Sequence, residues 1–125
     1  MILCDTNILI EVYRKNVDVI SELDNIAHNN AFVISDVTFA EILVGARNKQ
    51  EMKILIKELR QMKCLPIQSE ISMRAIQLLI AYHLSHGLDF HDALIASTAI
   101  HHNIELFTLN VKDFAFISDI RLYGQ

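Results

Sequence analysis

The chain has 125 residues, of which 52% are hydrophobic, and a formal net charge of −4. This length fits one domain spanning residues 1–125, and the hydrophobic content excludes an intrinsically disordered chain. The chain has three glycines and one proline, whereas average usage predicts about 15 residues of these two types together. So few turn-forming residues exclude a hairpin-rich all-β protein. The acidic net charge speaks against a nucleic-acid partner.

Short strands and helices alternate along the chain. In chain order we expect a strand at 2–4, helices at 7–14 and 17–30, a strand at 31–35, helices at 36–47 and 50–63, a weak strand at 65–68, helices at 69–86 and 91–102, and strands at 104–108 and 121–123. The helices are assigned from apolar spacing and the strands from short apolar or β-branched runs. The alternation predicts an α/β fold: a three-layer sandwich whose central parallel sheet, of about five strands, is flanked by helices.

Acidic side chains follow several of these strands. Asp5 comes directly after the first strand, Glu41 lies in the helix after the second, and Asn110 and Asp113 follow the 104–108 strand. The carboxyl ends of parallel strands share one edge of a sheet, where ligands bind. Asp92 adds another carboxylate near the start of a helix rich in small residues.

Burying a carboxylate such as Asp5 in an apolar stretch is costly unless a cation compensates it. Oxygen ligands suit Mg²⁺ or Mn²⁺, so the acids indicate a metal site. Each acid also has a purely structural interpretation. Asp5 is a candidate helix N-cap, Thr38-x-x-Glu41 matches a capping box, and Asp89 is a better cap than Asp92 for the helix that follows.

Four segments resemble the PIN-domain ribonucleases, in particular the VapC toxins of bacterial and archaeal toxin–antitoxin pairs. They are I-L-C-D-T-N-I-L-I, S-D-V-T-F-A-E-I-L-V-G-A, D-F-H-D-A-L-I-A-S-T-A and L-F-T-L-N-V-K-D-F, in the family's order and spanning nearly the whole chain. The resemblance implies Mg²⁺- or Mn²⁺-dependent hydrolysis of RNA phosphodiester bonds, and a small antitoxin that holds the enzyme inactive.

The resemblance also assigns the site residues. The family's first three acids fall on Asp5, Glu41 and Asp92, with Asp5 and Asp92 binding the metal directly and Glu41 assisting or holding a second ion. The family often places an aspartate where this chain has Asn110. Asp113, three residues later, could replace it through the water shell of the metal.

Basic residues gather in the helix expected at 50–63. Four of them recur at spacings of 4, 4 and 3 residues and share one helical face: Lys49, Lys53, Lys57 and Arg60. A solvated helix face is the default interpretation, and a ridge that contacts RNA phosphates is the alternative. His83-x-x-His86 could bind Zn²⁺, but no further ligand stands at a suitable spacing.

Two cysteines 60 positions apart, Cys4 and Cys64, form no disulfide framework, which is typical of the reducing cytoplasm. No apolar run approaches the roughly 18 residues of a membrane span, and no basic segment precedes the apolar start, so neither a membrane anchor nor a signal peptide is expected. A mean hydropathy of +0.29 indicates apolar surface covered by another chain, as a homodimer, a bound antitoxin or both.

Two rival functions remain open at this point. Asp5 in D-T-N could be the nucleophile of a phosphatase or phosphotransferase, although such enzymes of the haloacid dehalogenase type need a second aspartate where Asn7 stands. The chain could also be a catalytically inactive PIN-like binding module, because Asn110 departs from the family pattern.

Overall fold

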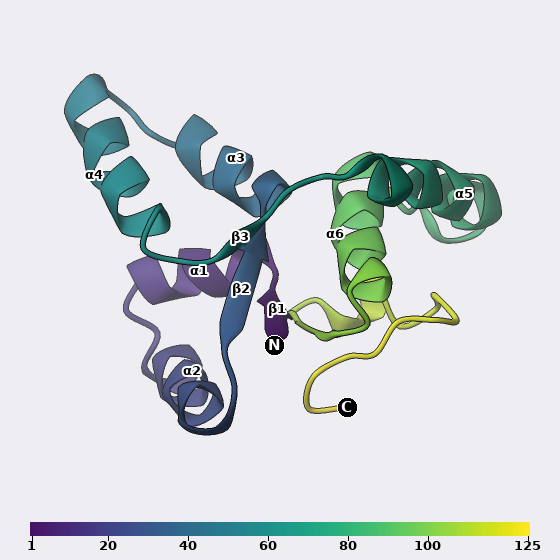
Figure 1. Ribbon diagram of the computed structural model, residues 1–125, viewed down its shortest axis with the longest axis horizontal. Helices are drawn as coiled ribbons and strands as arrows, with labels where there is room; N and C mark the ends of the chain where they lie inside the picture. Colours follow the sequence, from purple (N-terminus) through teal and green to yellow (C-terminus); the bar gives the residue numbers. More distant parts are fainter.

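The structure, a computed structural model describing residues 1–125, has four short strands and six α-helices (Figure 1). In chain order these are β1 (Ile2–Cys4), α1 (Thr6–Tyr13), α2 (Val17–Asn29), β2 (Phe32–Ser35), α3 (Asp36–Val44), α4 (Lys49–Leu59), β3 (Cys64–Leu65), α5 (Ser69–His86), α6 (Phe90–His101) and β4 (Glu105–Phe107), followed by the 3₁₀ turn η1 (Val111–Asp113). The predicted α/β order is confirmed.

The strands form one parallel sheet in the order β3-β2-β1-β4. Leu3 at the centre of β1 lies opposite Val33 on one side and Leu106 on the other. The chain adds β2 and β3 on one side of β1 and then returns to add β4 on the other. β1 is therefore a topological switch point, and ligands of open α/β sheets bind beyond the carboxyl ends of the strands at such a point.

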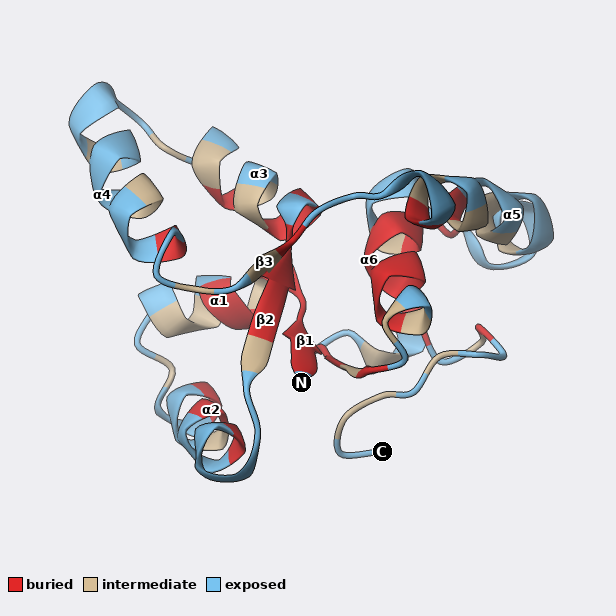
Figure 2. Cartoon of the chain, in the orientation of Figure 1, coloured by how far each residue is buried: buried red, intermediate tan, exposed pale blue.

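Alternate residues of each strand point to opposite faces of the sheet, and both faces are covered. Leu3, Val33 and Leu106 pack into a core with α5 and α6, whereas their strand neighbours pack into a second core with α1, α2 and α3. The strands are accordingly red throughout most of Figure 2, as is most of α6. Each strand needs apolar residues at nearly every position because the sheet lies between two layers of helices.

Side chains at the helix ends fix where the helices start and stop. The Ser35 hydroxyl accepts a hydrogen bond from the Val37 N–H and caps α3, and the Asp89 carboxylate does the same for α6 through the Asp92 N–H. Gly87 ends α5 with a φ of 71°, a left-handed conformation that glycine adopts without steric cost. α5 spans 69–86 as predicted.

Two predicted strands are shorter than expected. The strand predicted at 65–68 pairs only at Cys64 and Leu65, because Pro66 has no N–H to continue the ladder. The fifth strand predicted at 121–123 is wrong as a strand. It is reduced to one bridge between Leu106 and Leu122, so the sheet has four strands. No helix in the structure combines the length and apolarity needed to cross a membrane.

α6 offers a test of this packing, because seven consecutive residues, Ala93–Ala99, are buried there. We expect Ala96→Leu to lower the free energy of unfolding by about 1–3 kcal/mol, since a larger side chain must displace close-packed neighbours. Ala81→Leu, at an exposed position of α5, should change it by less than about 0.5 kcal/mol. Urea unfolding followed by circular dichroism measures both, and an equal effect of the two changes would contradict the close packing of α6.

Candidate active site

Asp5 lies at the carboxyl end of β1, and its carboxylate is held from two sides. Only 6% of the residue is exposed. Its Oδ1 accepts a hydrogen bond from the Thr6 N–H at 2.7 Å, and its Oδ2 accepts one from the Thr108 hydroxyl, directly after β4, at 2.8 Å. The predicted cap of the first helix is therefore present, and the carboxylate also joins two neighbouring strands at their carboxyl ends.

Burial raises the pKa of Asp5, and the negative charges of Glu41 and Asp113 raise it further, against the two hydrogen bonds that favour the ionised form. A carboxylate that only caps a helix is stabilised by the helix terminus and needs no other acids nearby. The electrostatics of Asp5 therefore indicate a site and not only a helix cap.

Glu41 reaches the same region from the middle of α3, beyond the Ser35 cap. Its Oε1 accepts a hydrogen bond from the Thr6 hydroxyl at 2.8 Å. The Thr6 oxygen lies 3.0 Å from the fully buried Thr38 hydroxyl. Because Thr6 gives its only hydroxyl proton to Glu41, Thr38 must donate to Thr6. A hydrogen-bonded row from Thr38 through Thr6 thus positions Glu41, and Thr38 does not act as the cap that the Thr38-x-x-Glu41 pattern predicted.

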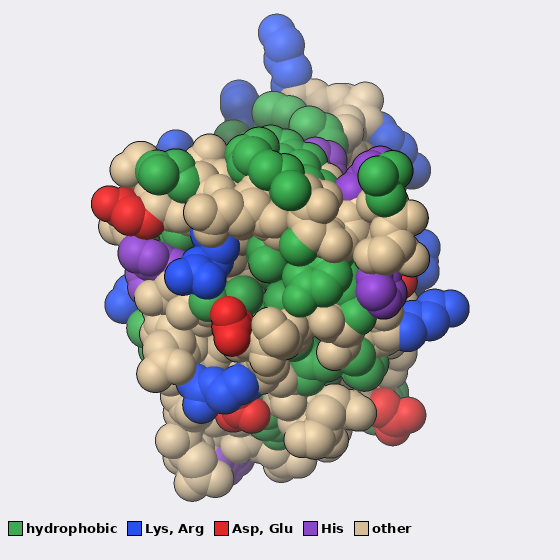
Figure 3. All heavy atoms as spheres, turned by 90° about the vertical axis from the view of Figure 1, so that its right-hand side faces the viewer, with side chains coloured by type: hydrophobic (Ala, Val, Ile, Leu, Met, Phe, Trp, Pro, Cys, Tyr) green, Lys and Arg blue, Asp and Glu red, His purple; other side chains and the backbone are tan.

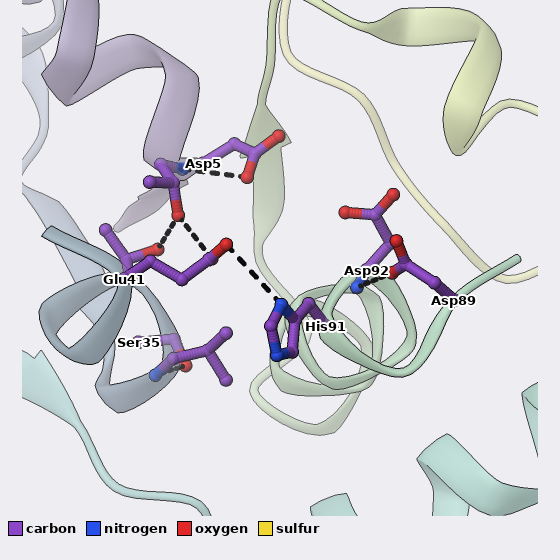
Figure 4. A network of polar contacts seen from close by, with 9 residues as sticks. Asp5, Ser35, Glu41, Asp89, His91 and Asp92 are labelled. Carbon is purple, nitrogen blue, oxygen red and sulfur yellow. Dashed lines mark hydrogen bonds and ion pairs between the residues drawn. The ribbon is translucent and has the colours of Figure 1, made fainter. Parts of the chain in front are cut away.

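Asp92 projects from the first turn of α6 toward the other two acids (Figure 4). Burial, followed by the charges of Asp89, Asp5, Asp113 and Glu41, raises the pKa of Asp92 to about 7. Burial and like charge both disfavour the ionised form of Asp92, and a cation bound beside it would favour that form.

Asn110 and Asp113 are the two candidates for the fourth acidic position of the family. The Asn110 backbone N–H donates to the Thr108 hydroxyl at 3.1 Å, which ties the loop to the residue that holds Asp5. Asp113 is exposed in η1, and its charge acts on both Asp5 and Asp92. Asp113 is therefore the acid that the structure brings to the group.

Two neighbours of the acids gave no clear signal in the sequence. His91 extends from α6 so that its Nδ1 lies 3.6 Å from Oε2 of Glu41, with 65% of its side chain exposed (Figure 4). The Asn7 side chain accepts from the Leu109 N–H at 3.3 Å and so joins α1 to the loop after β4. The D-T-N and F-H-D strings place both residues beside a candidate acid, which is the one hint that sequence provides.

A groove of about 300 Å³ adjoins the acids, between the end of α3, the loop before α5 and the start of α6. Glu41 and His91 form part of its wall, and the rest is mostly apolar, including Val44, Ile67 and Phe90. Glu41 therefore borders an apolar groove.

The acids fit a hard divalent cation. They supply oxygen donors only, and burial together with neighbouring negative charge raises the pKa values of Asp5 and Asp92, which a bound cation would oppose. No three side chains of the types His, Cys, Asp and Glu converge tightly enough to enclose an ion by themselves. Such an open arrangement suits Mg²⁺, which keeps several waters and is usually bound through one or two carboxylates.

The zinc interpretation of His83 and His86 has no support in the structure. The His83 ring is hydrogen-bonded to the Leu88 carbonyl at 2.7 Å, and the His86 ring stacks on Phe116 with centroids 4.2 Å apart. Each ring has its own partner, and no third ligand is near.

The basic side chains of α4 lie apart from the acids. All four (Lys49, Lys53, Lys57 and Arg60) are exposed and none forms an ion pair. α4 packs beside α3, on the side away from α6 (Figure 1). The positive ridge therefore flanks the acidic site and does not line it.

Comparison with known proteins supports one family. The sequence model of the PIN domain matches residues 2–118. Ribonuclease VapC10 of Mycobacterium tuberculosis is 30% identical over 122 residues, which cover 97% of this chain and 91% of that protein.

Solved structures of similar fold come from toxin–antitoxin systems. A toxin–antitoxin complex from Klebsiella pneumoniae has 31% identity and a TM-score of 0.78, covering 96% of this chain and 95% of that chain. VapBC2 from Rickettsia felis, bound to a promoter DNA fragment, has 25% identity and a TM-score of 0.81, with coverage of 98% and 97%. VapBC-1 from nontypeable Haemophilus influenzae has 26% identity and a TM-score of 0.79, with coverage of 98% and 96%. The match along nearly its whole length shows that this chain belongs to the PIN-domain family.

Proposed function

We propose that the chain is a divalent-metal-dependent ribonuclease and the toxin of a VapBC-type toxin–antitoxin pair. The observation that carries this proposal is the approach of Asp5, Glu41 and Asp92, from three separate elements, at the carboxyl edge of the sheet, where burial and neighbouring carboxylates raise the pKa values of Asp5 and Asp92. The ribonuclease and toxin–antitoxin relatives in the same family supply the substrate class.

Asp5 and Asp92 would hold the metal ion, assisted by Glu41 and with Asp113 at the fourth acidic position. Mg²⁺ or Mn²⁺ bound there would supply positive charge and a water of lowered pKa for attack on a phosphodiester. The protein supplies alignment. Thr108 and the Thr6 N–H fix both oxygens of Asp5, and the Thr6 hydroxyl fixes one oxygen of Glu41. Preorganised carboxylates of this kind spend no energy on reorientation during the reaction.

The geometry disfavours Asp5 as the nucleophile of a phosphotransferase. Both of its oxygens already accept short hydrogen bonds, and the residue is 6% exposed. These bonds fix the carboxylate at the buried end of β1 and oppose the movement that attack on a phosphorus atom requires, whereas a cation can be held through the lone pair that each oxygen keeps free. The inactive-module alternative is weakened by Asp113, which restores the negative charge that Asn110 lacks.

The proposed partners follow from the same relatives. A cognate small antitoxin would bind the chain in the cytoplasm, by analogy with the toxin–antitoxin complexes of similar fold. Self-association as a homodimer accounts for the apolar surface that a mean hydropathy of +0.29 anticipates.

Substitution of Asp5 tests the activity. We expect Asp5→Asn to abolish Mg²⁺-dependent cleavage of RNA while circular dichroism and thermal unfolding still show a folded protein, because the amide keeps a hydrogen-bond acceptor but loses the charge. Asp119→Asn, at an exposed acid outside the group, should cleave at the wild-type rate. Full activity of Asp5→Asn, or hydrolysis of p-nitrophenyl phosphate in place of RNA, would refute the assignment.

Metal binding should depend on pH through Asp92. A raised folded-state pKa means that the metal-free fold is favoured while Asp92 is protonated, and this advantage is lost as the pH rises through about 7. At higher pH a bound cation would stabilise the ionised Asp92. Mg²⁺ at about 10 mM should therefore raise the Tm by several degrees more at about pH 8 than at about pH 5.5. Asp92→Asn should raise the Tm of the metal-free protein at the higher pH and remove the difference. Equal Mg²⁺ shifts at both pH values in the wild type would contradict a role for Asp92.

The basic ridge on α4 is proposed as an RNA-phosphate contact. Changing Lys49, Lys53 and Lys57 together to Gln should weaken RNA binding and reduce the slope of log K against log salt by about 2, because each lost contact with single-stranded RNA removes about 0.7. A triple Gln variant at Lys63, Lys112 and Arg121, with the same change in net charge, is the control. If both variants have the same slope, the ridge is an ordinary solvated helix face.

A further inference from the structure

The groove beside the acids shares one wall with them. Glu41 and His91 form part of that wall, and Oε2 of Glu41 lies 3.6 Å from Nδ1 of His91. In Figure 4, His91 reaches from the first turn of α6 toward Glu41, whereas Asp92 leaves the same turn toward Asp5. A phosphodiester held at the acids would therefore have one of its two nucleosides at the mouth of the groove.

Two consecutive aromatic rings border the groove at the start of α6. Phe90 is 44% exposed, and the side chain of His91 is 65% exposed. The other walls are mostly apolar and include Val37 and Leu94. Proteins bind unpaired RNA bases chiefly by stacking them on exposed aromatic rings. A volume of about 300 Å³ is small for a ligand site, so the groove suits one base and not a longer segment.

Phe90 stands where the groove meets the apolar side of the molecule. It also lines a hollow with Leu79 and Ile80 of α5. Figure 3, which views the molecule from the α5 side, shows hydrophobic side chains gathered over its upper and central part. No Lys or Arg lines the groove or this hollow. These surfaces offer a phosphate no positive charge, but they can take the uncharged base attached to it.

Asp36 supplies a hydrogen-bond acceptor at the groove wall. Its Oδ1 accepts a hydrogen bond from the Cys64 thiol at 3.0 Å. Burial, followed by the Asp36 carboxylate, raises the pKa of Cys64 to about 12, so the thiol keeps its proton and remains a donor. This bond holds the Asp36 carboxylate in place and leaves its Oδ2 free. A carboxylate oxygen accepts from the N4 amine of cytosine but repels the O4 carbonyl that uracil has at the same position.

We propose that the groove is a nucleobase subsite, in which one base flanking the scissile phosphate stacks on Phe90 and His91 and donates a hydrogen bond from an exocyclic amine to Asp36. The inference rests on the proposed ribonuclease function and adds a specificity to it. At this position the enzyme favours a base that carries an amine, such as cytosine, over uracil.

Binding of two hexanucleotides tests the role of Asp36. Hexacytidylate and hexauridylate carry the same base at every position, so the comparison does not depend on the register of the strand. Fluorescence anisotropy gives both Kd values with Ca²⁺, which also takes oxygen ligands, in place of Mg²⁺, and a gel checks that the RNA stays intact. We expect the wild type to bind hexacytidylate at least about fivefold more tightly.

Asp36→Asn should lose this preference, because an amide also donates to the O4 carbonyl of uracil while its oxygen still accepts from the Cys64 thiol. Asp18→Asn is the matched control, since it removes the corresponding exposed acid from the first turn of α2. The control should keep the wild-type preference.

Substitution of Phe90 tests the stacking. Phe90→Leu keeps an apolar wall but removes the ring, so the Kd of both hexanucleotides should rise at least about fivefold. Phe90→Tyr keeps the ring and should bind like the wild type. Val17→Ala, at an exposed apolar position of α2 outside the groove, should have no effect. All variants should keep the wild-type circular dichroism spectrum.

Equal affinity of the wild type for the two hexanucleotides, no binding of either, or wild-type affinity of Phe90→Leu would overturn the subsite. If Phe90→Leu leaves RNA binding unchanged but weakens a complex with the antitoxin or a second copy in sedimentation velocity, the groove belongs to a protein interface. Cleavage of RNA without these preferences would overturn the subsite and leave the activity. The same preferences in a protein that does not cleave RNA with Mg²⁺ would overturn the activity and leave the subsite.

Discussion

The arrangement of the site depends on one buried carboxylate at the end of the central strand. Asp5 is satisfied by a backbone N–H one residue later and by the Thr108 hydroxyl, 103 residues away. These two hydrogen bonds join β1, α1 and the end of β4 at a single point. Burial of the carboxylate makes the bonds strong and also makes the charge costly, so this point favours both a rigid fold and a bound cation.

Much of the fold was predictable because the sheet is buried on both faces. Continuous apolar strands such as residues 2–4 and 31–35 stand out from the amphipathic helices, and α5 was placed at its observed bounds. The edges of the sheet were less predictable. The weak third strand and the lost fifth strand are limited by Pro66 and by the turns around Leu122, whose effect depends on neighbours distant in sequence.

The candidate site also has predictable and less predictable parts. Asp5 and Glu41 follow the ends of strands, and Asp92 lies at the start of the helix that leads into β4, so their approach was predictable from the order of the elements. The proximity of Asp113 to these acids was less predictable, because its charge reaches Asp5 and Asp92 through the fold of the loop after β4 and not through sequence spacing. The contacts of Thr38 and His91 were not predictable, because their partners, Thr6 and Glu41, lie 32 and 50 positions away. Their contacts arise from packing of α3 against α1 and α6.

The net charge of −4 proved a poor guide to the partner. Four of the fifteen acids (Asp5, Glu41, Asp92 and Asp113) interact electrostatically at one edge of the sheet. Four of the eleven basic residues lie apart from them, along α4 and at its C-cap. The total conceals this separation. For a protein that handles phosphates through a metal, the spatial distribution of charge is the informative quantity.

The 103-residue separation between Asp5 and Thr108 has a consequence for biosynthesis. No continuous segment of the chain contains the proposed site, since its candidate acids extend from position 5 to position 113. A growing polypeptide contains Asp5 from the start of translation, but the Thr108 hydroxyl that binds its carboxylate is missing until nearly the whole sequence has left the ribosome. At an elongation rate of about 5–20 residues per second, a nascent nuclease of this design is harmless for several seconds, which gives a partner made in the same cell time to be present when the last part of the site closes.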